Sequence, residues 1–226
     1  MEKSIIAKTV AESGMFRGVP ENEVYTLLEK FGARCAEYSK GEIILRNGVR
    51  VHEFGLLAVG AASIVHEDFW GNRTLISKLG EGQLFAEAFA LSGGTQTYVT
   101  VTADRECTVV WLDADKVTDI GGSPTEAHAR MLANLLSDFA SKALTVNEKM
   151  RHMSKRTTKQ KLLSYLSARA AENSSSEFDI PLGRTQLADY LAVDRSAMTT
   201  ELSKLQKEGA VEFSGRHFRL LHADAE

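Results

Sequence analysis

The sequence predicts an α+β protein with three parts in order: an antiparallel β-roll, one long helix and a C-terminal winged helix-turn-helix. Short β-like runs punctuated by glycine fill residues 34–113, an apolar heptad pattern follows, and two short amphipathic helices precede a hairpin. With 226 residues, the chain exceeds the usual single domain. We therefore expect a roll domain at 1–122, a long helix at 123–153 and a winged domain at 154–226.

The roll follows a helical segment, residues 4–31, whose apolar side chains Val24, Leu27, Leu28 and Phe31 share one face. Glycines separate the β-like runs, and Gly71-Asn72 is typical of a two-residue hairpin turn. Many short antiparallel strands with glycine turns indicate a barrel or jelly roll, here a cupin-like double-stranded β-helix. The expected strands are 42–45, 54–59, 62–66, 74–79, 98–102 and 108–112.

The long helix carries apolar residues at alternating gaps of four and three over three heptads. This 3.5-residue period predicts packing along a partner helix, most simply the same helix of a second chain. A helix of about thirty residues extends roughly 45 Å, more than one small domain needs. Burial of the helix along its own roll is the alternative. The predicted dimer seam consists of Leu132, Leu136, Phe139, Ala143, Val146, Met150 and Met153.

The helix-turn-helix is predicted over residues 184–205. Its first helix has an inner stripe of Leu187, Ala188 and Leu191, and its second has Met198, Leu202 and Leu205, with Val193 in the turn between them. Asp194 stands at the N-cap of the second helix, and Gly209 marks its end. A helix that begins with arginine and small polar residues suits insertion into the DNA major groove, although an ordinary helical hairpin gives the same pattern.

A hairpin and a basic helix flank these two helices. Residues 211–221 alternate apolar and polar side chains around Ser214-Gly215, which predicts a wing whose tip carries Arg216 and His217. Upstream, a helix expected from Ser154 has four cations near its start, beside apolar Leu162, Leu163 and Leu166. Both the wing tip and this basic cluster suit contact with phosphate.

Charge and cysteine usage narrow the class of protein. The net charge is −3, but residues 1–150 hold 15 Lys and Arg against 20 Asp and Glu, whereas residues 151–221 hold 12 against 8. This asymmetry is typical of a roll attached to a DNA-binding domain.

Cys35 and Cys107 match no disulfide or metal framework. Neither a signal peptide nor an eighteen-residue apolar run is present, so we expect a soluble, cytoplasmic protein with no membrane partner.

In its order of parts, the chain resembles the CRP/FNR family of bacterial transcription regulators over about residues 10–221. The resemblance rests on Glu67–Arg73 with Gly82–Ala88, on the long helix ending in Ser154–Thr158, and on Leu187–Met198. It implies a homodimer on a palindromic operator, with an effector in a cyclic-nucleotide-binding-like roll that moves the long helices. The implied partners are double-stranded DNA, a second copy of the chain, RNA polymerase and an unidentified small-molecule effector.

The segment that corresponds to the family's phosphate-binding turn departs from the family pattern. Glu87 is retained, but Ala86 replaces glycine, and the positions of the Arg-Ser pair are occupied by Thr97 and Tyr98. No Arg or Lys lies between residues 84 and 104. An anionic phosphate would lack its charge-assisted partner there, which argues against cyclic AMP or cyclic GMP.

Other effectors stay open. An iron–sulfur cluster needs several cysteines, and none precedes Cys35. His52 or His66 could be an axial haem ligand, although a lone histidine on a strand is more often a surface residue. A small organic effector, a redox event at Cys35 or Cys107, and a roll without a ligand are the remaining alternatives. The candidate pocket residues are Phe85, Glu87, Phe89, Gln96, Thr97, Tyr98, Asn134 and Asp138.

By resemblance, the recognition helix presents Arg195, Ser196, Ala197, Thr199 and Thr200 to DNA. Arg195 is suited to a bidentate contact with guanine. Many relatives carry Glu at the position of Ser196 and Arg at that of Thr200, so a different operator consensus is expected. The candidate phosphate contacts are Arg184, Thr185, Arg216 and His217.

Two other functional classes compete with a DNA-binding regulator. An enzyme in a cupin-like roll lacks support, because the sequence has no nucleophile motif and no His/Glu metal cluster. A signalling scaffold would use the roll and coil to hold a partner. Whether a regulator of this kind activates or represses is left open by the sequence.

Overall fold

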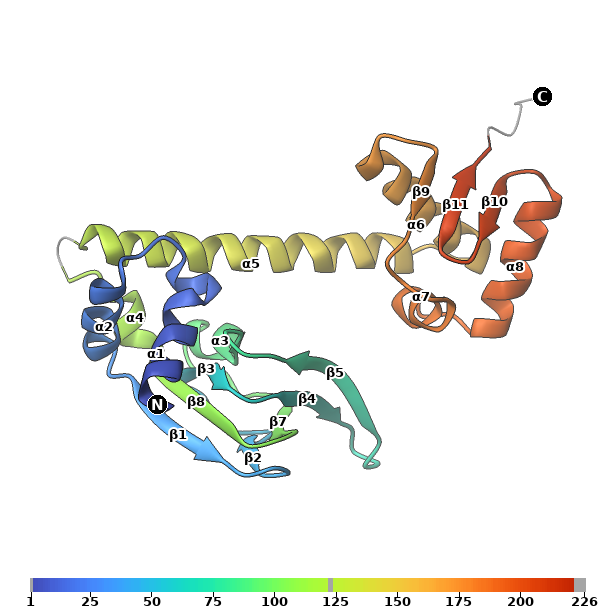
Figure 1. The fold of residues 1–226 in the computed structure, drawn as a ribbon. Helices are drawn as coiled ribbons and strands as arrows, with labels where there is room; N and C mark the ends of the chain where they lie inside the picture. The colour runs from blue at the N-terminus through green and yellow to red at the C-terminus, as the bar shows by residue number, and fades with distance from the viewer. Residues whose placement is uncertain (1, 122–123, 222–226) are drawn as a thin grey trace. The chain divides into compact units, whose positions relative to one another are not determined.

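The computed structural model describes residues 2–121 and 124–221, with side chains from Ile6 onward (Figure 1). The chain divides into two compact units within the long helix, between Phe139 and Ala140. The boundary expected at residues 122 and 123 lies outside the described residues, and the predicted domain limits stay predictions. None of the described helices combines the length and apolarity that a membrane span requires.

Three short helical segments precede the roll: α1 (Glu2–Glu12), the 3-10 turn η1 (Gly14–Phe16) and α2 (Glu21–Lys30). The helical stretch expected at 4–31 is therefore interrupted. Gly18 adopts a left-handed φ of +72°, and Pro20 is the N-cap of α2. A continuous helix cannot pass through such a pair.

The roll consists of two four-stranded sheets whose neighbouring strands are antiparallel. This confirms the predicted β-roll, although the run expected at 98–102 becomes a strand only at Thr100. Short helices α3 (Glu87–Leu91) and α4 (Ala114–Thr118) follow the strands β6 (Leu84–Phe85) and β8 (Cys107–Asp113). The first sheet is β1 (Arg34–Tyr38), β8 (Cys107–Asp113), β3 (Glu53–Val59), β6 (Leu84–Phe85); the second is β2 (Ile43–Leu45), β7 (Thr100–Ala103), β4 (Ala62–Glu67), β5 (Arg73–Leu79).

Strand β3 is buried on both of its faces, because one face packs against helices and the other against the second sheet. Leu56 belongs to the cluster with the N-terminal helices and the start of the long helix α5 (Glu126–Met153), whereas Leu57 belongs to the cluster between the sheets. A Cβ atom on Gly55 would lie 2.2 Å from the Phe85 ring. Only glycine at this position lets Phe85 fill the roll interior.

The β4–β5 hairpin has a longer turn than the sequence predicted. Because Glu67 pairs with Arg73, the loop contains five residues rather than the expected two. The Asp68 carboxylate accepts hydrogen bonds from the backbone N–H groups of Trp70 and Asn72, both at 2.9 Å. This side-chain turn competes with the two-residue geometry and leaves Phe69 and Trp70 exposed at the tip.

The long helix α5 (Glu126–Met153) has two apolar faces. Ala127, Met131 and Leu135 are buried in the core of the roll unit. The predicted seam lies on another face: Leu132, Phe139 and Met153 are half-buried, while Leu136, Ala143, Val146 and Met150 are exposed. The helix is thus used by its own roll at its beginning, where Leu132 of the predicted seam also packs against the roll core, while Leu136, Ala143, Val146 and Met150 are left exposed in the protomer.

The second unit contains the winged helix-turn-helix that the sequence predicted. It consists of the end of α5, α6 (Thr158–Asn173), β9 (Glu177–Asp179), α7 (Arg184–Leu191), α8 (Arg195–Lys207), β10 (Val211–Ser214) and β11 (His217–Leu220). Its core joins the predicted inner stripes of α7 and α8 to Leu162, Leu166 and Phe218. Strand β9, which the sequence pattern did not predict, pairs with β11 to give the sheet order β10-β11-β9.

Helix α6 begins later than expected, at Thr158 rather than Ser154. The Thr157 side chain accepts a hydrogen bond from the Gln160 N–H, which makes it the N-cap. Residues 154–157 instead form the link between α5 and α6. A good N-cap defines the first turn of a helix more strongly than the propensity of the residues before it.

Candidate nucleic-acid interface

The start of α8 is fixed by its N-cap, as predicted. The Asp194 carboxylate accepts hydrogen bonds from the backbone N–H groups of Ser196 and Ala197, at 2.8 and 2.9 Å, and from the Ser196 hydroxyl. These hydrogen bonds lower the pKa of Asp194. The first turn of α8 is therefore rigid and keeps its side chains exposed.

The two faces of α8 differ sharply. Met198, Leu202 and Leu205 are fully buried in the module core. The opposite face is hydroxylic and cationic, and within the described residues the Arg195 guanidinium has no carboxylate partner. An exposed groove along this face is lined by Asp194, Arg195, Ser196, Thr199, Thr200, Ser203, Lys204 and Lys207. Such a face can offer hydrogen bonds to base edges and charge to phosphates.

The basic cluster before α6 separates into two groups. Lys159 pairs with Glu208 at 2.6 Å, and Lys161 donates to the carbonyls of Leu191 and Ala192 at the end of α7, both at 3.2 Å. These two lysines hold the helices of the module together. Lys155 and Arg156 form no ion pair within the described part of the chain.

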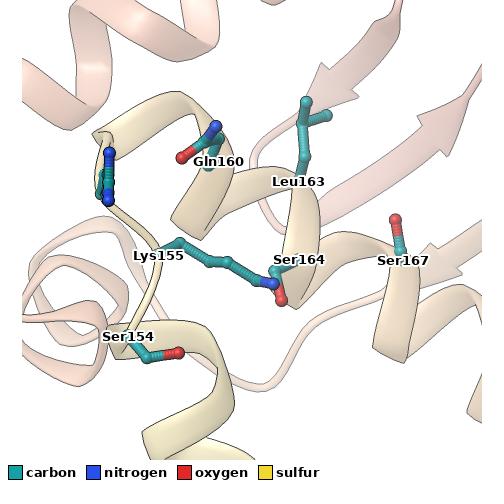
Figure 2. Close-up of a pocket in the computed structure, with 7 residues that line it drawn as sticks. Ser154, Lys155, Gln160, Leu163, Ser164 and Ser167 are labelled. Carbon is teal, nitrogen blue, oxygen red and sulfur yellow. The ribbon is translucent and has the colours of Figure 1, made fainter.

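Lys155 and Arg156 border a groove between the end of α5 and α6 (Figure 2). Serine hydroxyls, the Gln160 amide and the Leu163 side chain line the rest of it, and the Lys155 side chain extends toward Ser164. Of the predicted basic cluster, this is the part still available to an external anion.

The wing places its two predicted tip residues in different surroundings. Arg216 is exposed beside Gly215, which has a left-handed φ of +59°. The His217 ring lies between the carboxylates of Glu177 (3.0 Å) and Asp179 (3.3 Å) of β9. The Glu177 hydrogen bond, followed by that of Asp179, raises the pKa of His217. Both ring nitrogens are engaged, so the structure does not favour His217 as a phosphate contact.

Arg184 also has a structural partner. Its guanidinium lies over the rings of Phe213 and Phe218, 4.6 and 5.0 Å from their centroids. This cation–π packing joins the start of α7 to the wing, and burial lowers the pKa of Arg184. Thr185, next in the chain, is exposed.

Among the candidate pocket residues, Phe89 and Tyr98 contact each other edge-to-face, and the others differ in burial and partners. Phe85 is a core side chain packed edge-to-face on Trp111, and Thr97 is buried, with its hydroxyl donating to the Arg46 carbonyl at 3.0 Å. Glu87 is buried at the start of α3, Phe89 is half-buried, and Gln96, Tyr98 and Asp138 are exposed. The Asn134 amide donates to the carbonyls of Met15 and Arg17, which ties α5 to η1.

The fold brings the backbone of Arg50 beside segment 84–104, which contains no Lys or Arg of its own. Residues 46–50 run beside 95–97, and Arg50 forms an isolated antiparallel bridge with Gln96. An aromatic cluster lies nearby, in which Tyr98 contacts Phe89 and His66 edge-to-face. Neither feature was visible from spacing along the chain.

The histidine and cysteine residues named for the haem and redox alternatives lie in different surroundings. The exposed His52 packs against Gly94, where a Cβ atom would lie 2.3 Å from the imidazole. Among residues 2–121 and 124–221, no three His, Cys, Asp or Glu side chains are grouped to hold a metal ion. The Cys107 thiol donates to two backbone carbonyls, and burial raises its pKa, which disfavours the reactive thiolate. Cys35 is exposed.

Comparison with known families assigns both halves of the chain. Residues 35–121 match the cyclic nucleotide-binding domain, and residues 160–225 match the Crp-like helix-turn-helix domain. The transcriptional activator protein FnrL of Cereibacter sphaeroides is 21% identical over 189 residues, which cover 79% of this chain and 73% of FnrL.

Solved structures share the fold at low identity. CprK in complex with OCPA is 12% identical, has a TM-score of 0.58, and the match covers 88% of each chain. The N-terminal domain of a transcriptional regulator from Streptomyces coelicolor is 13% identical, with a TM-score of 0.51 over 61% of this chain and 94% of that domain. At these identities the likeness extends to the fold alone.

Proposed function

Because the chain belongs to the CRP/FNR family of transcription regulators and carries a Crp-like DNA-binding helix-turn-helix, we propose that it binds a palindromic operator as a homodimer. In this proposal, α8 enters the major groove and Arg195, Ser196, Ala197, Thr199 and Thr200 face the bases. Arg216 at the wing and Thr185 at the start of α7 contact phosphates. The roll senses an effector and transmits its occupancy to the DNA-binding domain through α5.

The uncovered seam of α5 is the observation that carries the proposal. Leu136, Val146 and Met150 are 71%, 56% and 61% exposed in the protomer, although they repeat with the period of a coiled coil. Water-exposed apolar side chains in such a row are stabilised when a second helix covers them. Two-fold pairing along α5 would present two copies of α8 to half-sites about one DNA turn apart.

Operator selection tests this function. The purified full-length chain is incubated with a random duplex library at physiological salt, and the bound sequences are read. We expect an inverted repeat, with two protomers bound per duplex in analytical ultracentrifugation. Enrichment of no sequence, or of a non-repeated site bound by one protomer, would overturn the proposal.

We propose that the effector is not a cyclic nucleotide. Segment 84–104 has no cation, so a cyclic phosphate would lack a charge-assisted partner within it. From outside the segment, the backbone of Arg50 bridges to Gln96, and Lys78 is already paired with Asp104 at 2.7 Å. Millimolar cyclic AMP and cyclic GMP are therefore expected to leave the thermal midpoint unchanged, and a saturable rise with either would contradict the proposal.

RNA polymerase is the further partner that we propose for an activator of this family. In vitro transcription from a promoter that contains the selected operator gives the sign of the regulation. Increased transcript supports contact with polymerase, whereas decreased transcript supports repression by occlusion.

A further inference from the structure

His152 is a buried titratable residue at the joint between the long helix and the DNA-binding module. It is the penultimate residue of α5, and its side chain is 0% exposed. Residues of three helices surround it. We call the group Glu148, His152, Ser164, Tyr165, Arg169 and Tyr190 the junction cluster.

Only one of the two ring nitrogens of His152 has a hydrogen-bond partner among the described residues. Its Nδ1 lies 2.8 Å from the Ser164 hydroxyl of α6. Its Nε2 is buried and has no hydrogen-bond partner among the described residues, because the nearest carboxylate oxygen, Glu148 Oε1, is 3.7 Å away. The ring faces pack edge-to-face on Tyr165 and at a tilt on Tyr190 of α7, with centroids 5.8 and 6.4 Å away.

The Glu148 carboxylate already forms an ion pair with Arg169. Its Oε1 pairs with Arg169 at 2.8 Å, and Arg169 also pairs with Glu172 at 2.7 Å while lying over the Tyr165 ring. The Arg169 Nε is itself buried with no partner in the described part of the chain. Glu148 therefore cannot approach His152 without weakening its ion pair with Arg169.

The charges around His152 favour its neutral form. Burial is the main cause that lowers its pKa, and Arg151 of the same helix acts in the same direction, as does Arg169 of α6. Glu148 opposes them. Lys155 adds a positive charge beside Ser164 in the adjoining groove, and Lys149 lies over the Tyr190 ring. A protonated His152 would need water or a closer Glu148 carboxylate, and in the junction cluster that carboxylate stays 3.7 Å from Nε2 because it is paired with Arg169.

We propose that His152 is a pH-sensitive positioning residue: neutral, it locks α6 and α7 onto the end of α5, and proton uptake loosens this joint and weakens operator binding. The proton comes from solvent and goes to the ring nitrogen that lacks one, so no other covalent bond changes. Both ring nitrogens of the imidazolium carry N–H groups, so the Ser164 hydroxyl can only accept from Nδ1, and the Nε2 N–H must move toward Glu148 or water. This inference rests on the proposed DNA-binding function.

The test measures operator affinity of the full-length protein between pH 5.8 and 8.0 at constant ionic strength. All variants carry His217→Gln, because the charge of His217 at the wing also varies with pH and would obscure the effect of His152. We compare this background with His152→Gln, whose amide can still bond Ser164 but cannot take up a proton. In the background, affinity should fall about threefold to tenfold from pH 7.5 to 5.8, and the His152→Gln variant should show no such fall.

Two results would overturn the inference: affinity in the background that does not change with pH, or the same fall in the His152→Gln variant. If the protein binds no duplex even at pH 8.0, the proposed function fails and the inference falls with it.

A readout without DNA guards against a variant that does not fold. In the His217→Gln protein, the NMR signal of the His152 Cε1 should titrate with a midpoint below about 6.5, together with ring signals of Tyr190. A midpoint at or above that value contradicts the inference.

Discussion

Arg184 and Arg195 are the first residues of the two helices in the helix-turn-helix, yet their surroundings give them different roles. Arg184 lies over two phenylalanine rings and joins α7 to the wing. Arg195 is exposed, next to the Asp194 cap that fixes the first turn of α8. A guanidinium that is held in the protein contributes to the fold, whereas an exposed one with no carboxylate partner is available to a base or a phosphate.

Replacement of Arg195 tests base recognition. Arg195→Ala should weaken binding to the selected operator by about 1–3 kcal/mol, roughly 5- to 150-fold, while binding to a scrambled duplex changes much less. The matched control is Lys207→Ala, at the far end of the same exposed face, which should affect both duplexes alike. Equal weakening on both duplexes for Arg195→Ala would assign it to phosphate contact instead. Fluorescence anisotropy at fixed salt measures both affinities.

His217 gives a pH-dependent prediction of the opposite sign to that of His152. Its pKa is raised by Glu177 and Asp179, so the folded state holds the proton more tightly than the unfolded chain. The stabilisation is fully present below about pH 6.5 and is lost as the pH rises through the raised folded pKa. Thermal midpoints of the wild type and His217→Gln should therefore differ at pH 6 and converge by pH 8.5. A constant difference across this range would contradict the role of the proton.

At the scale of elements, α5 shows how one helix serves two partners. Met131 and Leu135 pack into the roll core, and the heptad seam runs along another side of the same helix. The sequence pattern gives the heptad row, because a 3.5-residue period is local information, and its cover by a second helix stays a prediction. The pattern did not distinguish the residues of α5 that the roll covers from those of the seam, since both sets are apolar and recur at helical spacing.

Charge on the seam should disrupt the dimer. The double variant Val146→Glu and Met150→Glu should shift the protein to monomer and abolish operator binding, because four carboxylates would face one another across the pair. Leu144→Glu is the matched control: Leu144 is 70% exposed on the same helix but lies off the seam. Sedimentation at micromolar concentration measures both, and a Leu144→Glu protein that also dissociates would show that the interface lies elsewhere.

At the scale of the whole molecule, the net charge of −3 conceals a division of charge along the chain. The excess of cations lies in residues 151–221, the part that contains the helix-turn-helix. Association with DNA should therefore release counterions and weaken steeply with salt in spite of the acidic chain. Mean composition alone would have argued against nucleic acid.

Arg216 supplies the corresponding prediction. Arg216→Ala should weaken operator and scrambled duplex alike, and it should reduce the slope of log affinity against log salt by about 0.9 for each phosphate that is no longer neutralised. Affinities at four salt concentrations give the slope. An unchanged slope would remove the wing tip from the interface.

The sequence by itself determined the features that repeat or end locally: the glycine-punctuated strands, the heptad seam, the inner stripes of α7 and α8, and the Asp194 cap. Each depends on residues within about one or two turns or strands, so spacing is enough to reveal it. Only the tertiary structure decided the partners of charged and polar groups. The acidic neighbours of His217, the bridge between Arg50 and Gln96, and the closure of three helices around His152 join residues far apart in the chain. Such pairings depend on how the elements pack, and local periodicity carries no information about them.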